Sequence, residues 1–430
     1  MSIRVLLTCW PFPGHVFPHM SIAIALRERG CEVAFYTAEP LRQTIEAEGF
    51  TFFPFQAVRP ERWERIHRLE ERTGGRRQSL RVGHQAFRDW LVESIPEQVS
   101  DLQRIIDEWQ PDVLHTELSM WGPILILWEA VPIPVGLISF MGPMIPGPDA
   151  PAWGLGMAPP RSTISRLLVR MLNRSTDIVA SGLRRRVDFF RSQHGLPPLG
   201  CSVNEFTGRL PLYVVGNVPE LDYDRHDLPP SVHYVGPCVW HPPGRADGDG
   251  WLEEIPTDQP WVHVTEGTSH YQDPFVLKAA IEGLADRPMQ VILTAGRDRQ
   301  MPTDRPLAAN IHVAEWVNHD TLAPRCSVLV TTGGNGTVMA AMKAGVPLVI
   351  VPTTWDKPDN ARRVVEAGAG IRLLPRKCNP AGLREAVEQV LADPRYRDNA
   401  MRIAQRLAAA PGPPRAAQLI ERLAPSLQVG

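Results

Sequence analysis

The stretch VTTGGNGTVMAAMKAG, residues 330–345, places a glycine-rich turn between two predicted elements. The apolar run at 327–331 predicts a buried strand, and 337–344 predicts a helix that ends at Gly345. Free N–H groups and the positive dipole at a helix N-terminus bind anions, and glycines let a phosphate approach the backbone. The stretch is therefore a candidate diphosphate site, although a glycine turn alone is also compatible with a purely structural role.

The segment after this helix adds polar side chains at the end of a strand. Residues 348–351 predict a strand whose carboxyl end leads into TTWDKPDN, residues 353–360. Ligands bind at the carboxyl ends of strands in open parallel sheets, so Asp356 and Lys357 are placed to meet a sugar attached to the diphosphate. The alternative for Asp356 is that it caps the helix that begins before Pro358.

Two series of strand, helix and strand flank a segment that is rich in proline, glycine and aspartate. They lie at residues 3–8, 20–29 and 31–36, and at 261–264, 274–284 and 290–294. Such βαβ units connect parallel strands by a right-handed crossover. The segment between them, 241–250, predicts an interdomain linker. We therefore expect an α/β fold of two domains, residues 1–240 and 259–410, with the linker at 241–258.

Composition and charge exclude several classes of protein. The 430 residues carry 45 basic and 47 acidic side chains without a long like-charge block, which argues against nucleic-acid binding. No run approaches about 18 consecutive apolar residues, so no transmembrane segment is expected, whereas peripheral membrane association stays open. Six cysteines without a CxxC pair, and no signal peptide before the first strand, predict a cytoplasmic protein.

The glycine-rich stretch and the segment after it resemble a known signature. VTTGGNGTVMAAMKAGVPLVIVP at 330–352 with WDKPDNARRVVEAGAG at 355–370 is similar to the donor-binding region of family 1 glycosyltransferases of the GT-B fold, of the bacterial type that decorates macrolides, polyketides and enediynes. The likeness includes PGHVFP at 13–18, LPPSVHYVGP at 228–237 and EWVNH at 315–319. It implies two Rossmann-like domains that face each other across a cleft, with a C-terminal helix, within 411–430, packed back on the first domain.

Carried over residue by residue, the resemblance assigns the donor site to loops of the second domain. It implies that Trp316 lines the nucleotide-base pocket and that Asp356 contacts the sugar. Thr268 and the turn at 333–337 would contact the diphosphate. The full predicted donor set is Thr268, Trp316, Thr332, Gly333, Gly334, Asn335, Gly336, Thr337, Asp356 and Lys357.

The acceptor pocket is expected in the first domain. The proline-rich stretch 141–160 carries Met141 and Met144 and is interpreted either as an apolar wall of that pocket or as an exposed loop over ordinary core. With Phe12, these two methionines are the predicted acceptor-binding residues. They predict a small lipophilic acceptor.

His15 is the predicted catalytic base. It is expected on the first loop of the first domain, facing the cleft, and similar family members use this histidine to remove the proton of an acceptor hydroxyl. A carboxylate normally orients such a histidine, and the family pattern places one after the strand at 113–115. Glu117 is the predicted partner, unless it is a solvent-facing loop residue. The alternative register at Thr116 would leave the histidine without an acid.

Neither a metal nor a cofactor is expected. His15 and His19 are four residues apart, but no third ligand stands at a recognisable spacing, so His19 is expected to be a surface or hydrogen-bonded helix residue. The triplet DGD at 247–249 resembles a metal-binding DxD motif only superficially and belongs with the linker. The expected co-substrate is a UDP- or dTDP-sugar.

Three positions depart from the family pattern. Thr332 stands where the family has a diphosphate-binding histidine, Lys357 replaces a glutamine, and VNH at 317–319 replaces x-Pro-Gln. Lys357 or His319 could supply the missing positive charge to the leaving diphosphate. A lysine beside the sugar could instead select an acidic sugar, or catalysis could be lost.

The sequence thus predicts an inverting, metal-independent hexosyltransferase, a monomer or homodimer, that moves a sugar from a UDP- or dTDP-sugar to a hydroxyl of a lipophilic natural product. One alternative is a sterol, carotenoid or lipid glycosyltransferase that acts at a membrane surface. Another is a non-catalytic auxiliary protein of the same fold, suggested by Thr332 and Lys357, against which the retention of His15 argues.

Overall fold

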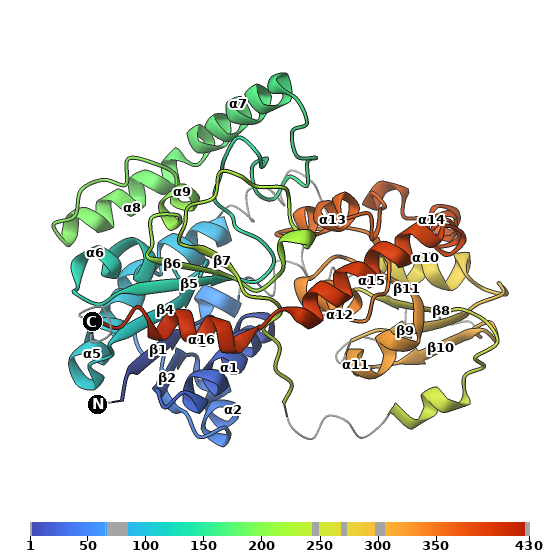
Figure 1. Ribbon diagram of the computed structural model, residues 1–430, viewed down its shortest axis with the longest axis horizontal. Helices are drawn as coiled ribbons and strands as arrows, with labels where there is room; N and C mark the ends of the chain where they lie inside the picture. The colour runs from blue at the N-terminus through green and yellow to red at the C-terminus, as the bar shows by residue number, and fades with distance from the viewer. Residues whose placement is uncertain are drawn as a thin grey trace.

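The chain forms two parallel sheets, one in each half of the sequence (Figure 1). The computed structural model describes residues 2–64, 66, 85–242, 249–267, 273–296 and 306–425. The first sheet has 7 strands in the order β3-β2-β1-β4-β5-β6-β7, and the second has 6 in the order β10-β9-β8-β11-β12-β13. Both orders reverse direction beside the first strand of the sheet, as in Rossmann-like domains. The expected α/β fold of two such domains is confirmed.

The first domain holds the blue to yellow-green elements of Figure 1. Its strands are β1 (Arg4–Thr8), β2 (Glu32–Thr37), β3 (Thr51–Pro54), β4 (Val113–Glu117), β5 (Val135–Ser139), β6 (Leu212–Val215) and β7 (Val232–Tyr234). Its helices include α1 (Pro13–Glu28), α2 (Arg42–Ala47), α5 (Ile95–Trp109), α6 (Trp128–Ala130), α7 (Thr163–Val179), α8 (Ser181–Gln193) and α9 (Val203–Thr207), with π-helical turns η2 (Arg88–Val92) and η3 (Pro123–Leu127).

The second domain follows the segment at 241–258, whose described part includes the 3-10 turn η5 (Asp249–Glu254). Its strands are β8 (Trp261–Thr265), β9 (Gln290–Thr294), β10 (Ile311–Ala314), β11 (Cys326–Thr331), β12 (Leu348–Ile350) and β13 (Gly370–Arg372). Its helices are α10 (Phe275–Gly283), α11 (His319–Leu322), α12 (Asn335–Lys343), α13 (Lys357–Glu366), α14 (Pro380–Ala392) and α15 (Pro394–Ala409), and α16 (Pro413–Glu421) ends the chain.

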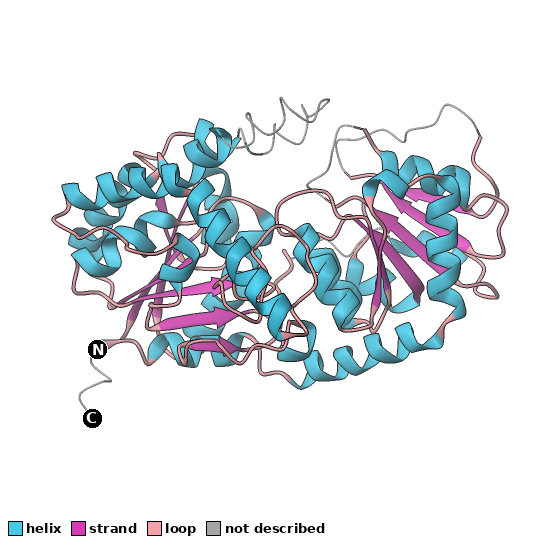
Figure 2. Ribbon diagram, turned by 90° about the horizontal axis from the view of Figure 1, so that it is seen from above, coloured by secondary structure: helices cyan, strands magenta, loops and turns pink. Residues whose placement is uncertain are grey.

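Helices cover both faces of each sheet, as Figure 2 shows from above. A strand that is covered on both faces is apolar along its whole length instead of alternating. The central strands β1 and β11 have this character, with the sequences RVLLT and CSVLVT and almost every residue buried. This explains why short apolar runs were sufficient to predict them.

Helix α1 begins earlier than the sequence predicted. Its first residue is Pro13 and not Met20, so the prediction that His15 lies on a loop is wrong. Proline fits the first helical position because its fixed φ suits a helix and its missing N–H has no partner there. Pro18 lies inside the same helix. By composition, Pro13, Gly14 and Pro18 indicate a loop, whereas in the structure they lie in the first turns of α1.

The six cysteines, all within the described residues, are free thiols. Burial raises the pKa of Cys238 and of Cys326 to about 12, so both thiols stay protonated and unreactive. Among the helices that the structure describes, none combines the length and the apolar character that crossing a lipid bilayer requires.

The last helix returns to the first domain. Helix α16 packs along α1, and its apolar residues share a buried cluster with the first sheet. Arg29 of α1 forms an ion pair with Glu421 of α16. Just before α16, Gly412 has a φ of 59° and its N–H donates to the carbonyl of Val235 at 2.7 Å. The connection to α16 therefore contacts the chain that leaves β7 (Figure 1).

A buried ion pair joins the two domains. Arg363 of α13 donates from Nε to Asp222 of the first domain at 2.6 Å, and its guanidinium lies 4.7 Å from the ring centroid of Tyr223. Tyr234 donates its hydroxyl proton to the same carboxylate. Burial opposes the charge on Arg363, but the neighbouring Asp222, Tyr223 and Asp359 together outweigh it and raise the pKa of the guanidinium. Apolar residues of both domains, among them Met141 of the first and Val364 of the second, form one cluster around this ion pair.

Replacing Arg363 with methionine should destabilise the protein. The variant keeps much of the side-chain volume but leaves the Asp222 carboxylate buried without its cation, which costs about 3 kcal/mol. Denaturant-induced unfolding followed by circular dichroism measures the difference. Arg395→Met, which removes an exposed pair with Asp393, should leave the unfolding midpoint unchanged. An Arg363→Met protein as stable as the wild type would contradict a joining role for the pair.

Candidate active site

A histidine and a buried carboxylate meet at the carboxyl edge of the first sheet. His15 lies in the first turn of α1, which follows β1, and Glu117 ends the neighbouring strand β4. Nδ1 of His15 contacts Oε2 of Glu117. Trp10 donates its backbone N–H to Oε1 at 2.8 Å, and Ser119 donates its hydroxyl proton to Oε2 at 2.8 Å. The carboxylate is thus fixed by groups on two loops.

Glu117 is ionised in this setting. Burial alone would raise the pKa of its carboxyl group, but His15 and the Trp10 N–H together lower it below the ordinary value. Because Nδ1 of His15 faces this carboxylate, the other ring nitrogen, Nε2, is left to exchange a proton with a ligand. The side chain of His15 is 26% exposed, so the ring is reachable.

The alternative register at Thr116 is excluded by geometry. The Thr116 hydroxyl accepts from or donates to the Thr8 hydroxyl at 2.7 Å in the interior of the sheet. His19, in turn, is buried, with Nδ1 at 2.8 Å from the carbonyl of His15 and no partner for Nε2. His19 is therefore not a surface residue, and among the described residues only one of its two ring nitrogens has a hydrogen-bond partner. Among the described residues, no group of three or more His, Cys, Asp and Glu side chains could hold a metal ion.

The glycine turn lies between β11 and α12, as predicted, with α12 beginning at Asn335. Gly333 has a φ of 95°, and a Cβ there would lie 2.9 Å from Ile350, so this position requires glycine. Among the described residues, no atom lies within 4 Å of a Cβ placed on Gly334 or Gly336. No side chain in the described part of the chain caps the first N–H groups of this helix. Such a place accommodates an anion.

Three other side chains of the predicted set lie around this turn. The buried Oδ1 atom of Asn335 has no hydrogen-bond partner among the described residues, and Thr337 is buried in the first turn of α12. The Thr332 hydroxyl donates to the carbonyl of Glu266 at 2.9 Å, which ties the end of β11 to the end of β8. Thr268, also predicted here, lies outside the described residues.

Asn360 connects the glycine turn to Asp356. Its side-chain amide donates to the Gly333 carbonyl at 3.0 Å and to Oδ2 of Asp356 at 2.8 Å, and the residue is fully buried. Asp356 occupies the N-cap position of α13 without a capping bond, so the capping alternative is wrong. Sequence reasoning missed Asn360. Its position four residues after Asp356, one helical turn away, was the signal that could have found it.

Lys357 and Trp316 differ in their burial. Lys357 is buried, and its Nζ donates to the Thr353 hydroxyl at 3.2 Å. The carbonyl and Cβ of Lys357 lie beside Gly333, so this residue borders the glycine turn. Trp316 follows β10 and is 39% exposed, which leaves a ring surface open to a stacking partner.

Aromatic rings bridge the two sides of the site. Trp355, the residue before Asp356, lies 4.3 Å from Phe87 and 6.2 Å from Trp90 of the first domain, between ring centroids. Trp90 contacts Phe12 at 5.9 Å, and Phe12 meets the ring of His15 edge-on at 5.2 Å. Trp355 has a φ of 64°, which is rare outside glycine and concentrates at functional sites. These ring contacts join the loop before α13 to His15.

The three predicted acceptor residues differ in their burial and in their contacts. Phe12 lies against His15, as above, and Met144 is half-buried with its N–H donating to the Tyr213 hydroxyl at 3.0 Å. Met141 is only 5% exposed and belongs to the interdomain cluster, so the structure places it in core and not on an open pocket wall.

The stretch at 141–160 also reaches the second domain. The backbone N–H groups of Gly154 and Gly156 donate to the two carboxylate oxygens of Asp359 at 2.5 and 2.7 Å. Burial raises the pKa of Asp359, while these N–H groups favour its ionised form. The stretch therefore packs against α13 next to Asp356, which corrects the interpretation of it as an exposed loop.

Comparisons with known proteins agree with this geometry. The family model described as "Erythromycin biosynthesis protein CIII-like, C-terminal domain" matches residues 279–423. A 4'-demethylrebeccamycin synthase of Lentzea aerocolonigenes is 34% identical over 432 residues, covering 98% of this chain and 100% of the relative.

Solved structures share the fold over nearly the whole chain. The glycosyltransferase of kitacinnamycin has a TM-score of 0.76 at 22% identity and covers 99% of this chain and 100% of its own. A spinosyn rhamnosyltransferase complexed with thymidine diphosphate has a TM-score of 0.69 at 19% identity, with coverage of 97% and 100%. With the full-length relative, these likenesses identify the chain as a member of the GT-B natural-product glycosyltransferases.

Proposed function

We propose that this glycosyltransferase moves a hexose or deoxyhexose from a UDP- or dTDP-sugar to a hydroxyl of a small lipophilic natural product, with inversion at the anomeric carbon. The observation that carries the proposal is the contact between His15 Nδ1 and the buried, ionised Glu117, which leaves Nε2 as a base. The name of the rebeccamycin relative supports a natural-product acceptor. The thymidine diphosphate in a structural neighbour supports this class of nucleotide.

In the proposed reaction, His15 Nε2 takes the proton of the acceptor hydroxyl as its oxygen forms a bond to the anomeric carbon. The bond from that carbon to the diphosphate breaks on the opposite face, so a single displacement inverts the configuration. Glu117 stabilises the imidazolium that forms and holds the ring in the tautomer that has a free Nε2. No metal is required for these steps, because proton transfer and charge stabilisation come from the chain.

The leaving diphosphate would receive its stabilisation at the start of α12. The open space above Gly334 and Gly336 and the N–H groups of the first turn suit its charge. Of the two cations that could compensate for Thr332, Lys357 is the better candidate because it borders the turn. Burial lowers the pKa of His319, so that ring is neutral near pH 7. Asn360 would keep Asp356 in place for the sugar hydroxyls.

Product formation tests the whole proposal. We expect a purified protein incubated with UDP- and dTDP-sugars and a panel of phenolic and polyketide acceptors to give an inverted glycoside, seen by mass spectrometry and by NMR of the anomeric proton. His15→Ala should lower kcat by about 10²–10⁴-fold. His194→Ala, at an exposed histidine on the end of α8, should be silent. Nucleotide binding without any product would instead favour a non-catalytic auxiliary protein.

Glu117→Gln should lower kcat by about 10²-fold or more with little change in the KM of the donor. The glutamine amide would donate to Nδ1 of His15 and shift the ring proton to Nε2, which removes the base. It would also lack the charge that stabilises the imidazolium. Steady-state kinetics against Glu108→Gln, an exposed control on α5, measures the effect. Wild-type kcat in Glu117→Gln would refute the orienting role.

Gly334→Val should weaken nucleotide binding without unfolding the protein. Gly334 has a φ of −60°, and its Cβ meets no protein atom, so valine fits the backbone but fills the space proposed for the diphosphate. We expect the Kd for UDP or dTDP to rise about tenfold, or ~1.4 kcal/mol, in isothermal titration calorimetry. Gly182→Val, at an equally open glycine of α8, is the control. Unchanged affinity in Gly334→Val would place the diphosphate elsewhere.

A further inference from the structure

Helix α7 turns its apolar side chains toward solvent. Five large apolar residues of this helix are more than half exposed: Ile164 at 74%, Leu167 at 57%, Leu168 at 60%, Met171 at 60% and Ile178 at 68%. Their spacing of three, four, seven and fourteen residues from the first puts them on one face of an α-helix. An amphipathic helix of a globular protein normally turns such a face to the core.

The side of α7 that faces the protein is held by polar contacts. The Asn173 side-chain amide lies 3.4 Å from the carbonyls of Gly147 and of Ala150. Arg166 forms an ion pair with Asp149 at 3.2 Å, and Val169 is the buried apolar residue among them. These bonds fix the rotation of the helix about its axis. The apolar face is therefore directed outward by the fold and is not an accident of a loose helix.

Positive charge accompanies the apolar face. Arg170 and Arg174 are exposed, and neither forms an ion pair with any residue that the structure describes. The one acidic residue of α7 is Asp177, which is half-buried. The exposed surface of the helix thus combines aliphatic side chains with unpaired guanidinium groups.

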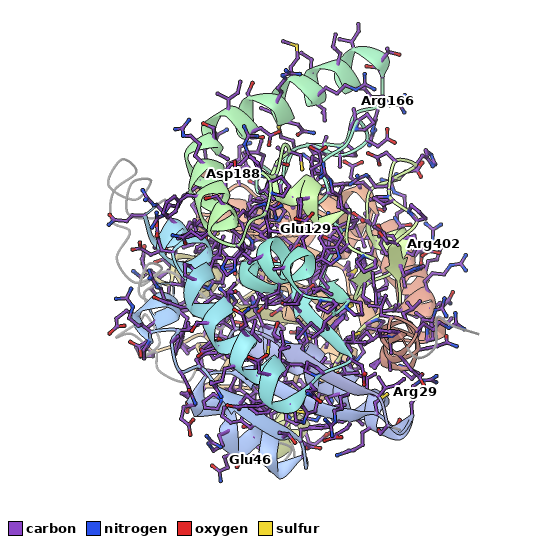
Figure 3. All side chains as sticks on the ribbon, turned by 90° about the vertical axis from the view of Figure 1, so that its left-hand side faces the viewer. Arg29, Glu46, Glu129, Arg166, Asp188 and Arg402 are labelled. Carbon is purple, nitrogen blue, oxygen red and sulfur yellow. The ribbon has the colours of Figure 1, made fainter. Side chains whose placement is uncertain are left out.

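The position of α7 leaves this face open. The helix lies at the outer edge of the first domain, at the top of both Figure 1 and Figure 3, where side chains project from its outer side. Its 17 residues span about 25 Å at 1.5 Å per residue. Arg166, labelled in Figure 3, lies on this helix. A straight, projecting helix presents a convex surface, without a groove for a partner segment.

We propose that α7 docks the protein on an anionic lipid surface, with the five apolar side chains in the boundary between headgroups and acyl chains and the arginines against the phosphates. A helix with an exposed apolar face and exposed arginines beside it has the composition of an interfacial helix. A stable dimer takes about 20–30 residues from each side, far more than this face offers. The surface lies outside the candidate active site and does not depend on the proposed donor or acceptor.

Vesicle binding tests the proposal with the full chain. Sedimentation with phosphatidylcholine vesicles that contain a third of phosphatidylglycerol should carry the wild type down, and vesicles of phosphatidylcholine alone should carry much less. Leu168→Glu with Met171→Glu should lower the partition coefficient at least about tenfold, because two carboxylates enter the apolar boundary. Arg170→Gln with Arg174→Gln should weaken binding to the anionic vesicles and reduce its dependence on salt.

Val313→Glu is the control, since it places one such carboxylate at a 38% exposed apolar residue of β10 in the other domain. It should bind vesicles as the wild type does, and all variants should keep the wild-type melting temperature. Failure of the wild type to bind anionic vesicles would overturn the proposal, as would full binding by the Leu168→Glu, Met171→Glu protein. A wild-type dimer that this double variant converts to a monomer in analytical ultracentrifugation would also overturn it and identify a second copy as the occupant.

Discussion

Asp222 and Arg363 form a buried ion pair, and the position of the Asp356 loop relative to the first sheet depends on it. The pair borders an apolar cluster built by both domains, and its polar neighbours include the Tyr234 hydroxyl and the Tyr223 backbone N–H, which both donate to Asp222. Separating them would expose two desolvated charges, which is costly. Since Arg363 is on α13, the first turn of that helix, with Asp356, keeps a fixed place relative to the first sheet. The contact of Trp355 with Phe87 extends the same constraint toward His15.

The fold was predictable from the sequence because its central strands are defined by local patterns of residues. Apolar runs such as β11 and β9 are buried on both faces, and a glycine follows two residues after each strand ends, so periodicity and turn residues define them. The start of α1 was not predictable in this way, because Pro13 and Pro18 are loop signals by composition and helical residues by position. The resemblance to the family implies Glu117 as the partner of His15, and the structure brings the two side chains into contact.

Other parts of the site depend on contacts between distant segments. The spacing of Asn360 from Asp356 indicates a contact between these two residues, but nothing in the sequence marks the bond of Asn360 to Gly333, since only the fold brings the Gly333 carbonyl to it. The left-handed backbone conformation of Trp355 could not be predicted from the sequence either. The sequence showed that Thr332 replaces a histidine, but not that its hydroxyl is already committed to the Glu266 carbonyl. Met141 was assigned to a pocket wall by its apolar character, which core residues share.

The return of α16 to the first domain changes the mechanics of the molecule. The polypeptide crosses between the domains twice, once after β7 and once before α16, and the two crossings touch where the Gly412 N–H meets the Val235 carbonyl. A single connection leaves the relative rotation of two bodies largely free, whereas a second connection removes part of that freedom. Any relative movement of the two domains would therefore have to bend both crossings together, close to the contact between Gly412 and Val235.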